Sequence, residues 1–139
     1  HMYRKYYIPM EIQEVTTEQV VTQQVKKFRK ELSSGTMALV LLSTLAKAKE
    51  PLYGYQIAKL LSHTGSEKQG ALYPVLRNLS TKGLLESKVE PSESGPPRKY
   101  FIISKLGRKV LTEWLQIWEK TQSFVNEVTS DNPSGDSNE

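Results

Sequence analysis

The stretch between residues 70 and 103 leaves this chain few folds to adopt. Apolar residues at its start repeat at the i, i+3, i+4, i+7 spacing of one helix face: Leu72, Val75, Leu76 and Leu79. Pro74 lacks an amide hydrogen and would clash in mid-helix, so the first helical turn should lie near residues 70–74. Lys82-Gly83 suits the end of that helix. The pattern predicts a short amphipathic helix with one buried face.

Two strand candidates follow this helix. Leu85–Val89 and Arg98–Ile103 are short and rich in strand-forming residues. Residues 90–97 between them are dominated by proline, serine and glycine, a composition typical of a loop. The sequence therefore predicts a β-hairpin that projects from the body of the protein.

A second short helix is predicted just upstream. Pro51 and Gly54 interrupt the chain, and residues 55–61 then form a helical pattern with Ile57, Leu60 and Leu61 facing inward. The polar residues 62–70 predict a turn. Two short helices joined by a turn and followed by a hairpin make a winged helix-turn-helix, in which the second helix of the pair enters the DNA major groove.

Longer helices are predicted on both sides of this unit. Thr16 and Gln19 have the spacing of a capping box, and Ser33-Ser34-Gly35 should end the helix that they begin. Thr36 can cap a further helix whose apolar body, Met37–Leu45, belongs in the core. Ser104 can cap a last helix that ends near residue 128.

These elements give a mainly α-helical fold with a small β-hairpin, divided into five parts. We expect an N-terminal arm (1–15), an extension helix (16–33), a winged-helix DNA-binding domain (34–104), a C-terminal dimerisation helix (105–128) and a disordered tail (129–139).

The surface predicted to meet DNA carries side chains that can donate hydrogen bonds. The outward positions of the second helix and the return strand of the hairpin hold Gln69, Tyr73, Arg77, Asn78, Lys82, Arg98 and Lys99. An arginine such as Arg77 can form two parallel hydrogen bonds with guanine, or bind a phosphate. Alternatively, each of these arginine and lysine side chains is an ordinary solvated surface residue. Tyr73 and Tyr55 could serve mainly to pack helices.

The net charge suits a polyanionic partner. It is +4 for the whole chain, and because Asp131, Asp136 and Glu139 lie in a tail without bases, residues 1–129 carry +7. A basic surface that is merely solvated would explain the charge equally well.

The last helix is too apolar for a single small domain. Burying its stripe against a second copy, together with part of the extension helix, would avoid a large exposed patch. The predicted dimer interface comprises Val21, Val25, Phe28, Leu111, Trp114, Leu115, Trp118 and Val125. A two-fold dimer would place two recognition helices over a near-palindromic double-stranded DNA site. Alternatively, Trp114 and Trp118 share a helix face that could stack a flat aromatic effector.

Other functions are disfavoured by what the sequence lacks. Without cysteine there is no disulfide, zinc finger or thiol nucleophile, and His63 has no acid–nucleophile set near it. We expect no enzyme activity, cofactor or metal site. No apolar run approaches the ~18 residues of a membrane span, so a cytoplasmic protein associated with the bacterial nucleoid is expected.

Several motifs resemble the PadR family of transcriptional regulators. They occur in the family's order and spacing across roughly residues 31–115: Glu31–Thr36, Leu52–Ile57, Gly70–Leu79, Lys82–Leu85, Gly95–Phe101 and Ser104–Arg108. The resemblance implies a dimeric winged-helix repressor with Tyr73 and Arg77 on the recognition helix and Arg98 and Lys99 on the wing.

Two features depart from the family pattern. Ser104-Lys105 replaces a more usual Thr-Glu, and the N-terminus extends beyond the minimal domain. In multidrug-sensing relatives, aromatic residues of the C-terminal helix hold flat drugs, which keeps a ligand-sensing repressor open as an alternative. A third hypothesis is a winged-helix module that contacts protein instead of DNA.

Overall fold

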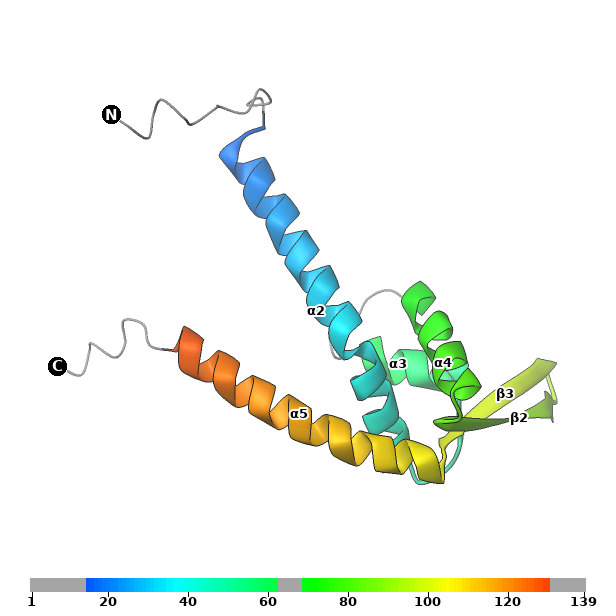
Figure 1. Cartoon of the computed structure of the whole chain (residues 1–139). Helices are drawn as coiled ribbons and strands as arrows, with labels where there is room; N and C mark the ends of the chain where they lie inside the picture. The colour runs from blue at the N-terminus through cyan, green and yellow to red at the C-terminus, as the bar shows by residue number, and fades with distance from the viewer. Residues whose placement is uncertain (1–14, 63–68, 131–139) are drawn as a thin grey trace, which may run out of the picture. The chain divides into compact units, whose positions relative to one another are not determined.

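The computed structural model describes residues 15–62 and 69–130 of the 139-residue chain. Its elements (Figure 1) are α2 (Thr17–Lys47), β1 (Leu52–Tyr53), α3 (Gly54–Ser62), the short 3₁₀ helix η1 (Gln69–Ala71), α4 (Leu72–Thr81), β2 (Leu85–Ser92), β3 (Gly95–Ile103) and α5 (Lys105–Thr129). The chain divides between Gly35 and Thr36 into two compact units, which are described separately. The mainly helical fold with a small antiparallel sheet is the winged-helix fold that the sequence predicts.

The N-terminal unit contains the first half of α2. The capping box is confirmed: the Gln19 amide donates to Thr16 Oγ1 at 3.1 Å, and the Thr16 amide donates to Gln19 Oε1 at 2.9 Å. The apolar stripe of this half-helix faces solvent, with Val21, Val25 and Phe28 each about half exposed or more. Within the described residues, these three side chains of the stripe are therefore not buried against the rest of the chain.

The predicted helix end at Ser33-Ser34-Gly35 is wrong. Helix α2 runs without interruption from Thr17 to Lys47. A glycine that ends a helix usually adopts a positive φ, and among the described glycines only Gly83 does so. Gly35 stays helical because its cost of ~1 kcal/mol relative to alanine is small beside the burial of Met37, Leu41 and Leu42 just after it. The other proposed domain boundaries stay predictions.

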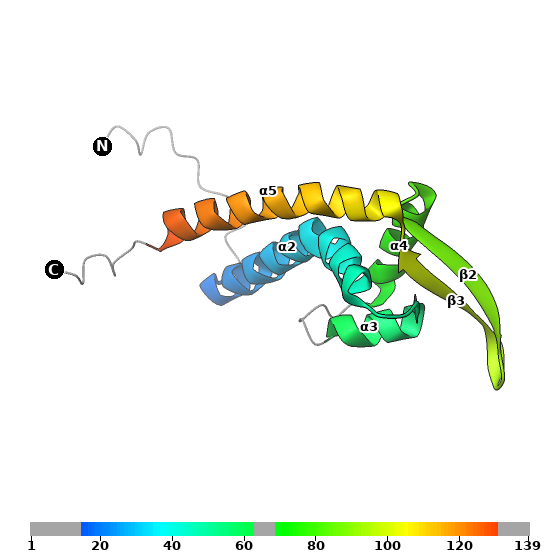
Figure 2. The ribbon, with the colours of Figure 1, turned by 90° about the horizontal axis from the view of Figure 1, so that it is seen from below.

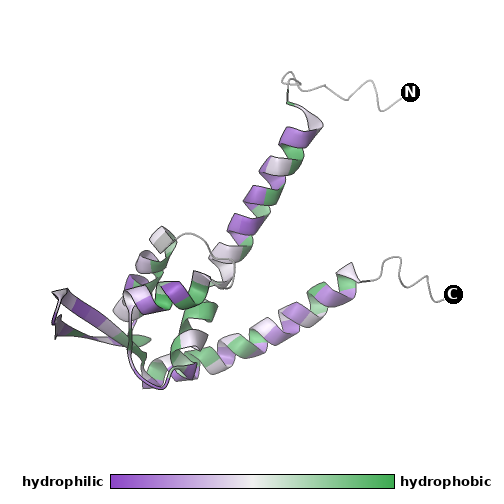
Figure 3. Ribbon diagram, turned by 180° about the vertical axis from the view of Figure 1, so that it is seen from behind, coloured by the Kyte–Doolittle hydropathy of each residue, from purple (hydrophilic) through white to green (hydrophobic). Residues whose placement is uncertain are grey.

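The core of the second unit lies where α2, α3, α4, the sheet and the start of α5 meet. Its fully buried side chains are Leu41, Leu42, Ile57 and Leu76. Figure 3 shows hydrophobic residues at this meeting point and also farther along α5. One inward prediction is wrong: Leu60 is 49% exposed, because α3 turns Ile57, Ala58 and Leu61 toward the core.

The sheet is larger than the sequence predicts. Its order is β1-β3-β2, all antiparallel, and the hairpin strands continue to Ser92 and from Gly95, so the loop of residues 90–97 shrinks to a tight turn. Pro91 falls at an irregularity between Glu90 and Ser92, a place where a missing amide hydrogen is tolerated. The hairpin projects away from the helices of this unit (Figure 2). Strand β1 has two residues and so offers no periodicity to detect.

The start of α5 is anchored to the loop after α4. Ser104 caps the helix as predicted, accepting from the Gly107 amide at 2.9 Å, and its hydroxyl donates to the Gly83 carbonyl at 2.7 Å. Gly107 lies so close to the Leu84 carbonyl that any Cβ there would overlap it. This close approach fixes where α5 leaves the sheet.

Several predictions fall outside the described residues. These are the arm up to residue 14, the part of the turn that contains His63, and the tail from residue 131. Among the described helices, none has the length and apolar character needed to cross a membrane.

Candidate nucleic-acid interface

Helix α4 separates its buried and exposed side chains cleanly. Leu72, Leu76 and Leu79 are buried, Val75 and Ser80 are half-buried, and the remaining positions of the helix are exposed to solvent. The exposed side chains include Tyr73, Arg77, Asn78 and, just past the helix end, Lys82. Residues 72–82 include two bases and no acid, so this surface is positive. Gln69 lies in η1, directly before α4.

Tyr73 packs against the start of α3 while remaining 45% exposed. A Cβ built on Gly54 would lie 2.9 Å from Cε1 of Tyr73 and 3.1 Å from its hydroxyl oxygen. Position 54 thus leaves room for the tyrosine ring only because it is glycine. The contact gives Tyr73 a packing role, and its exposed part remains available to a partner.

Arg98 and Lys99 lie on opposite faces of the hairpin, because successive residues of a strand alternate. Arg98 Cζ lies 4.4 Å from the centroid of the Tyr53 ring, on the sheet face that carries Tyr100. Lys99 Nζ lies 5.8 Å from the centroid of the buried Phe101 ring, on the core side. Both side chains are exposed, but they cannot act as one adjacent pair.

Arg98 stacks on one member of a group of three tyrosines that no sequence pattern predicts. The tyrosine cluster comprises Tyr53, Tyr55 and Tyr100: the Tyr53 and Tyr100 rings meet edge to face at 5.4 Å, and Tyr53 and Tyr55 stack at 6.5 Å. The pairing of Tyr53 with Tyr100 depends on β1, which no sequence period reveals. Without β1 the two tyrosines are distant residues with no reason to meet.

The hairpin carries as many acidic as basic side chains, but the two kinds are unevenly distributed between its strands. Its three acids, Glu86, Glu90 and Glu93, lie on β2 and the turn, and its bases are Lys88, Arg98 and Lys99. Lys88 Nζ pairs with Glu90 Oε2 at 3.4 Å. The two bases of β3 are therefore the positive side of the wing.

The predicted dimer residues fall into three groups. Leu111 is buried in the core of its own chain, so its assignment to a surface for a second copy is corrected. Trp114 packs partly against that core. The remaining predicted residues are exposed on α2 and α5: Val21, Val25, Phe28, Leu115, Trp118 and Val125.

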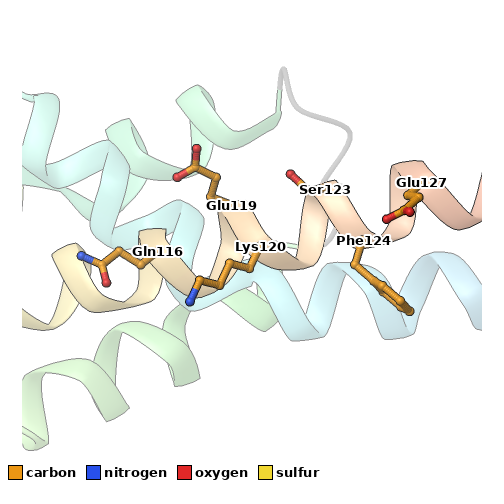
Figure 4. A pocket seen from close by; sticks show the side chains of 6 residues that line it. All are labelled: Gln116, Glu119, Lys120, Ser123, Phe124 and Glu127. Atoms are coloured by element: carbon orange, nitrogen blue, oxygen red, sulfur yellow. The ribbon is translucent and has the colours of Figure 1, made fainter.

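An open hollow lies along α5 (Figure 4). All six side chains that line it come from that one helix, and they are Gln116, Glu119, Lys120, Ser123, Phe124 and Glu127. Neither Trp114 nor Trp118 lines it, so this hollow gives the aromatic-effector hypothesis no support. Across residues 15–62 and 69–130, no group of three or more histidine or acidic side chains is arranged to hold a metal ion.

The sequence and the fold match known proteins. The model of the Transcriptional regulator PadR-like family matches residues 41–113. The chain is similar to a PadR family transcriptional regulator from Eggerthella lenta, with 32% identity, 81% of this chain and 98% of the other covered, and a TM-score of 0.71. A PadR-like transcriptional regulator from Bacillus cereus shows 28% identity, 73% and 99% coverage, and a TM-score of 0.62. An uncharacterized protein of Lysinibacillus sphaericus is 28% identical over 78 residues, which is 53% of this chain and 72% of that one.

Proposed function

The chain belongs to the PadR-like family of transcriptional regulators, which are non-enzymatic DNA-binding proteins. We propose that it acts as a homodimer that represses transcription by binding a near-palindromic promoter site. The observation that carries the proposal is the exposed face of α4. It presents Tyr73, Arg77 and Asn78 from a helix whose other face is locked into the core, and it includes no acid. A helix held in this way can enter the major groove with its donors outward.

The dimer rests on apolar residues that the single chain leaves exposed. Trp118 and Val125 on α5 are 37% and 46% exposed, and Val21, Val25 and Phe28 on α2 are more so. A second copy that buried these residues would remove them from water, at roughly 25 cal/mol per Å² of apolar surface. A two-fold axis would also repeat α4 about one DNA turn away.

Selection of bound sequences from a random duplex pool, followed by titration at two salt concentrations, tests the proposal. An inverted repeat with a steep salt slope is the expected result. Salt-sensitive binding without a motif would contradict a site-specific regulator, and the absence of duplex binding would favour the protein-interaction module.

A single substitution tests the assignment of α4. Arg77→Ala should weaken binding to the selected site by about 1–3 kcal/mol and relax the preference at one base pair. Lys120→Ala removes an exposed base from α5 and serves as the matched control, with parental affinity expected. If Arg77→Ala bound the selected site as tightly as Lys120→Ala and the parent protein, Arg77 of α4 would not contact a base.

The ligand-sensing alternative keeps one point in its favour, namely that Trp118 is accessible at 37% exposure. A flat aromatic effector stacked there would quench tryptophan fluorescence and lower DNA affinity together. Quenching that leaves DNA binding unchanged would rule out this form of regulation.

A narrower hypothesis identifies the chain with the period extender of the cyanobacterial circadian clock, a short PadR-like protein. Its support is the family membership. Overexpression in a cyanobacterium should lengthen the free-running period, and an unchanged period would count against it.

A further inference from the structure

We propose that Tyr53 is a positioning residue for DNA binding: its ring holds Arg98 on the wing so that the guanidinium meets a backbone phosphate. The inference rests on the proposed DNA-binding function and adds to it a residue that lies outside both the recognition helix and the wing.

The stacking contact leaves the hydrogen-bonding edge of Arg98 free. The guanidinium carbon lies 4.4 Å from the centroid of the Tyr53 ring, a distance typical of a cation–π contact. Arginine stacks through its flat face, whereas its five N–H donors point outward within the plane. Binding to Tyr53 and bidentate binding to a phosphate are therefore compatible, and the first restricts the side chain before the second occurs.

Tyr53 is itself held from several sides. Its amide donates to Gln56 Oε1 at 3.0 Å, and its backbone pairs with Tyr100 through the β1–β3 register. The Tyr100 ring meets it edge to face, and the Tyr55 ring stacks on it. A ring with these constraints can restrict the motion of an exposed arginine.

The carboxylate best placed to compete for Arg98 is engaged elsewhere. Glu90 is the cross-strand partner of Arg98, yet its ion pair is with Lys88 at 3.4 Å. Among the described residues, neither of the two ion pairs includes Arg98. The positive charge of Arg98 thus remains available to a polyanion.

Tyr53 also connects the wing with the recognition helix. The next residue, Gly54, begins α3 and lies under the Tyr73 ring of α4. Two consecutive residues therefore contact Arg98 on one side and Tyr73 on the other. This arrangement fixes the separation between the wing arginine and the major-groove helix, which two contacts on one duplex require.

A double-mutant cycle distinguishes positioning from ordinary packing. Tyr53→Leu, Arg98→Ala and the double variant are titrated with the selected duplex at two salt concentrations, and thermal unfolding of each is recorded. We expect Tyr53→Leu to weaken binding about two- to fivefold, the range of an exposed cation–π contact. Arg98→Ala should weaken binding further and reduce the salt slope by about one. The double variant should bind like Arg98→Ala alone, because Tyr53 acts through that arginine.

Conservative variants keep the test informative if Tyr53→Leu unfolds. Tyr53→Phe keeps the ring and should bind like the parent, whereas Arg98→Lys keeps the charge but loses the flat stack and should weaken binding. Tyr55→Leu removes a ring that stacks on Tyr53 but is not the ring beneath Arg98, and it should weaken binding less than Tyr53→Leu does.

The possible failures are separable. A parent protein that binds no duplex overturns the proposed function and this inference with it. If the parent binds but Arg98→Ala binds equally well, or if the Tyr53 and Arg98 effects simply add, the inference alone is overturned.

Discussion

The two halves of α5 have similar apolar stripes, but the stripe of the first half is buried and that of the second half is exposed. Leu111, Trp118 and Val125 follow one another at seven-residue spacing and so lie along one side of the helix. Their exposed fractions rise from 7% to 37% to 46% toward the C-terminal end. The first half packs into the core of its own chain, and the second half runs past that core.

The comparison shows that an apolar helix face does not specify what will cover it. The first half is buried because Ser104 and Gly107 hold the helix start against the backbone of Gly83 and Leu84. The second half has an equivalent stripe but no such anchor. Its residues are therefore candidates for a partner surface, whereas those of the first half stabilise the fold.

Leu111→Ala is expected to produce the largest loss of stability. Truncating a buried leucine removes hydrophobic contacts and leaves a cavity, at about 2–5 kcal/mol. Denaturant unfolding by circular dichroism measures the change. A loss below about 1 kcal/mol would show that the two halves of α5 do not differ in burial.

Gly107→Ala should follow, at about 1–3 kcal/mol, because the new methyl group overlaps a backbone carbonyl that cannot rotate away. The matched control is Gly35→Ala in α2, where the added Cβ would meet nothing within 4 Å besides its chain neighbours and the nearby backbone of its own helix. That variant should gain about 0.5–1 kcal/mol from its better helix propensity. Equal changes in the free energy of unfolding at the two glycines would show that the close contact at Gly107 does not hold the start of α5.

Ser104→Ala should cost about 0.5–2 kcal/mol by removing the helix cap and the bond to Gly83. Thr112→Ala, which removes an exposed hydroxyl bond to the Arg108 carbonyl, is the control and should change stability by less than about 0.5 kcal/mol. Urea titration of both variants gives the difference, and a loss at Thr112 as large as that at Ser104 would argue against the anchor.

Val125→Ala should have the smallest effect on the isolated chain, within about 0.5 kcal/mol at protein concentrations where the proposed dimer would dissociate. Sedimentation equilibrium on the same variant should instead show weaker self-association. A large loss of monomer stability would mean that the second half of α5 is already covered within one chain, and unchanged association would remove Val125 from the proposed interface.

Local signals in the sequence were sufficient for much of the fold. The Thr16–Gln19 capping box, the Ser104 cap and the Leu72–Leu79 stripe each specify structure through residues a few positions apart, and all three are confirmed. The exposed positions of α4 followed from the same stripe, since burying one face determines the other. Their contact with DNA stays a prediction.

Other features depended on residues far apart in the chain. Strand β1 exists because Leu52 and Tyr53 meet β3, and the place of Tyr53 beside Arg98 follows from that pairing. The unbroken α2 helix and the outward turn of Leu60 likewise reflect where the core lies.

The sequence by itself determined the two short helices, the hairpin, the last helix and the caps at Thr16 and Ser104, because hydrogen bonds and apolar periodicity act over three or four residues. It did not reveal β1 or the continuity of α2. The tertiary structure decided which apolar residues are buried, and so moved Leu111 from the predicted interface into the core. It also placed the Tyr53 ring against Arg98. Both outcomes depend on long-range packing, in which a residue's neighbours are set by the whole chain and not by the residues beside it.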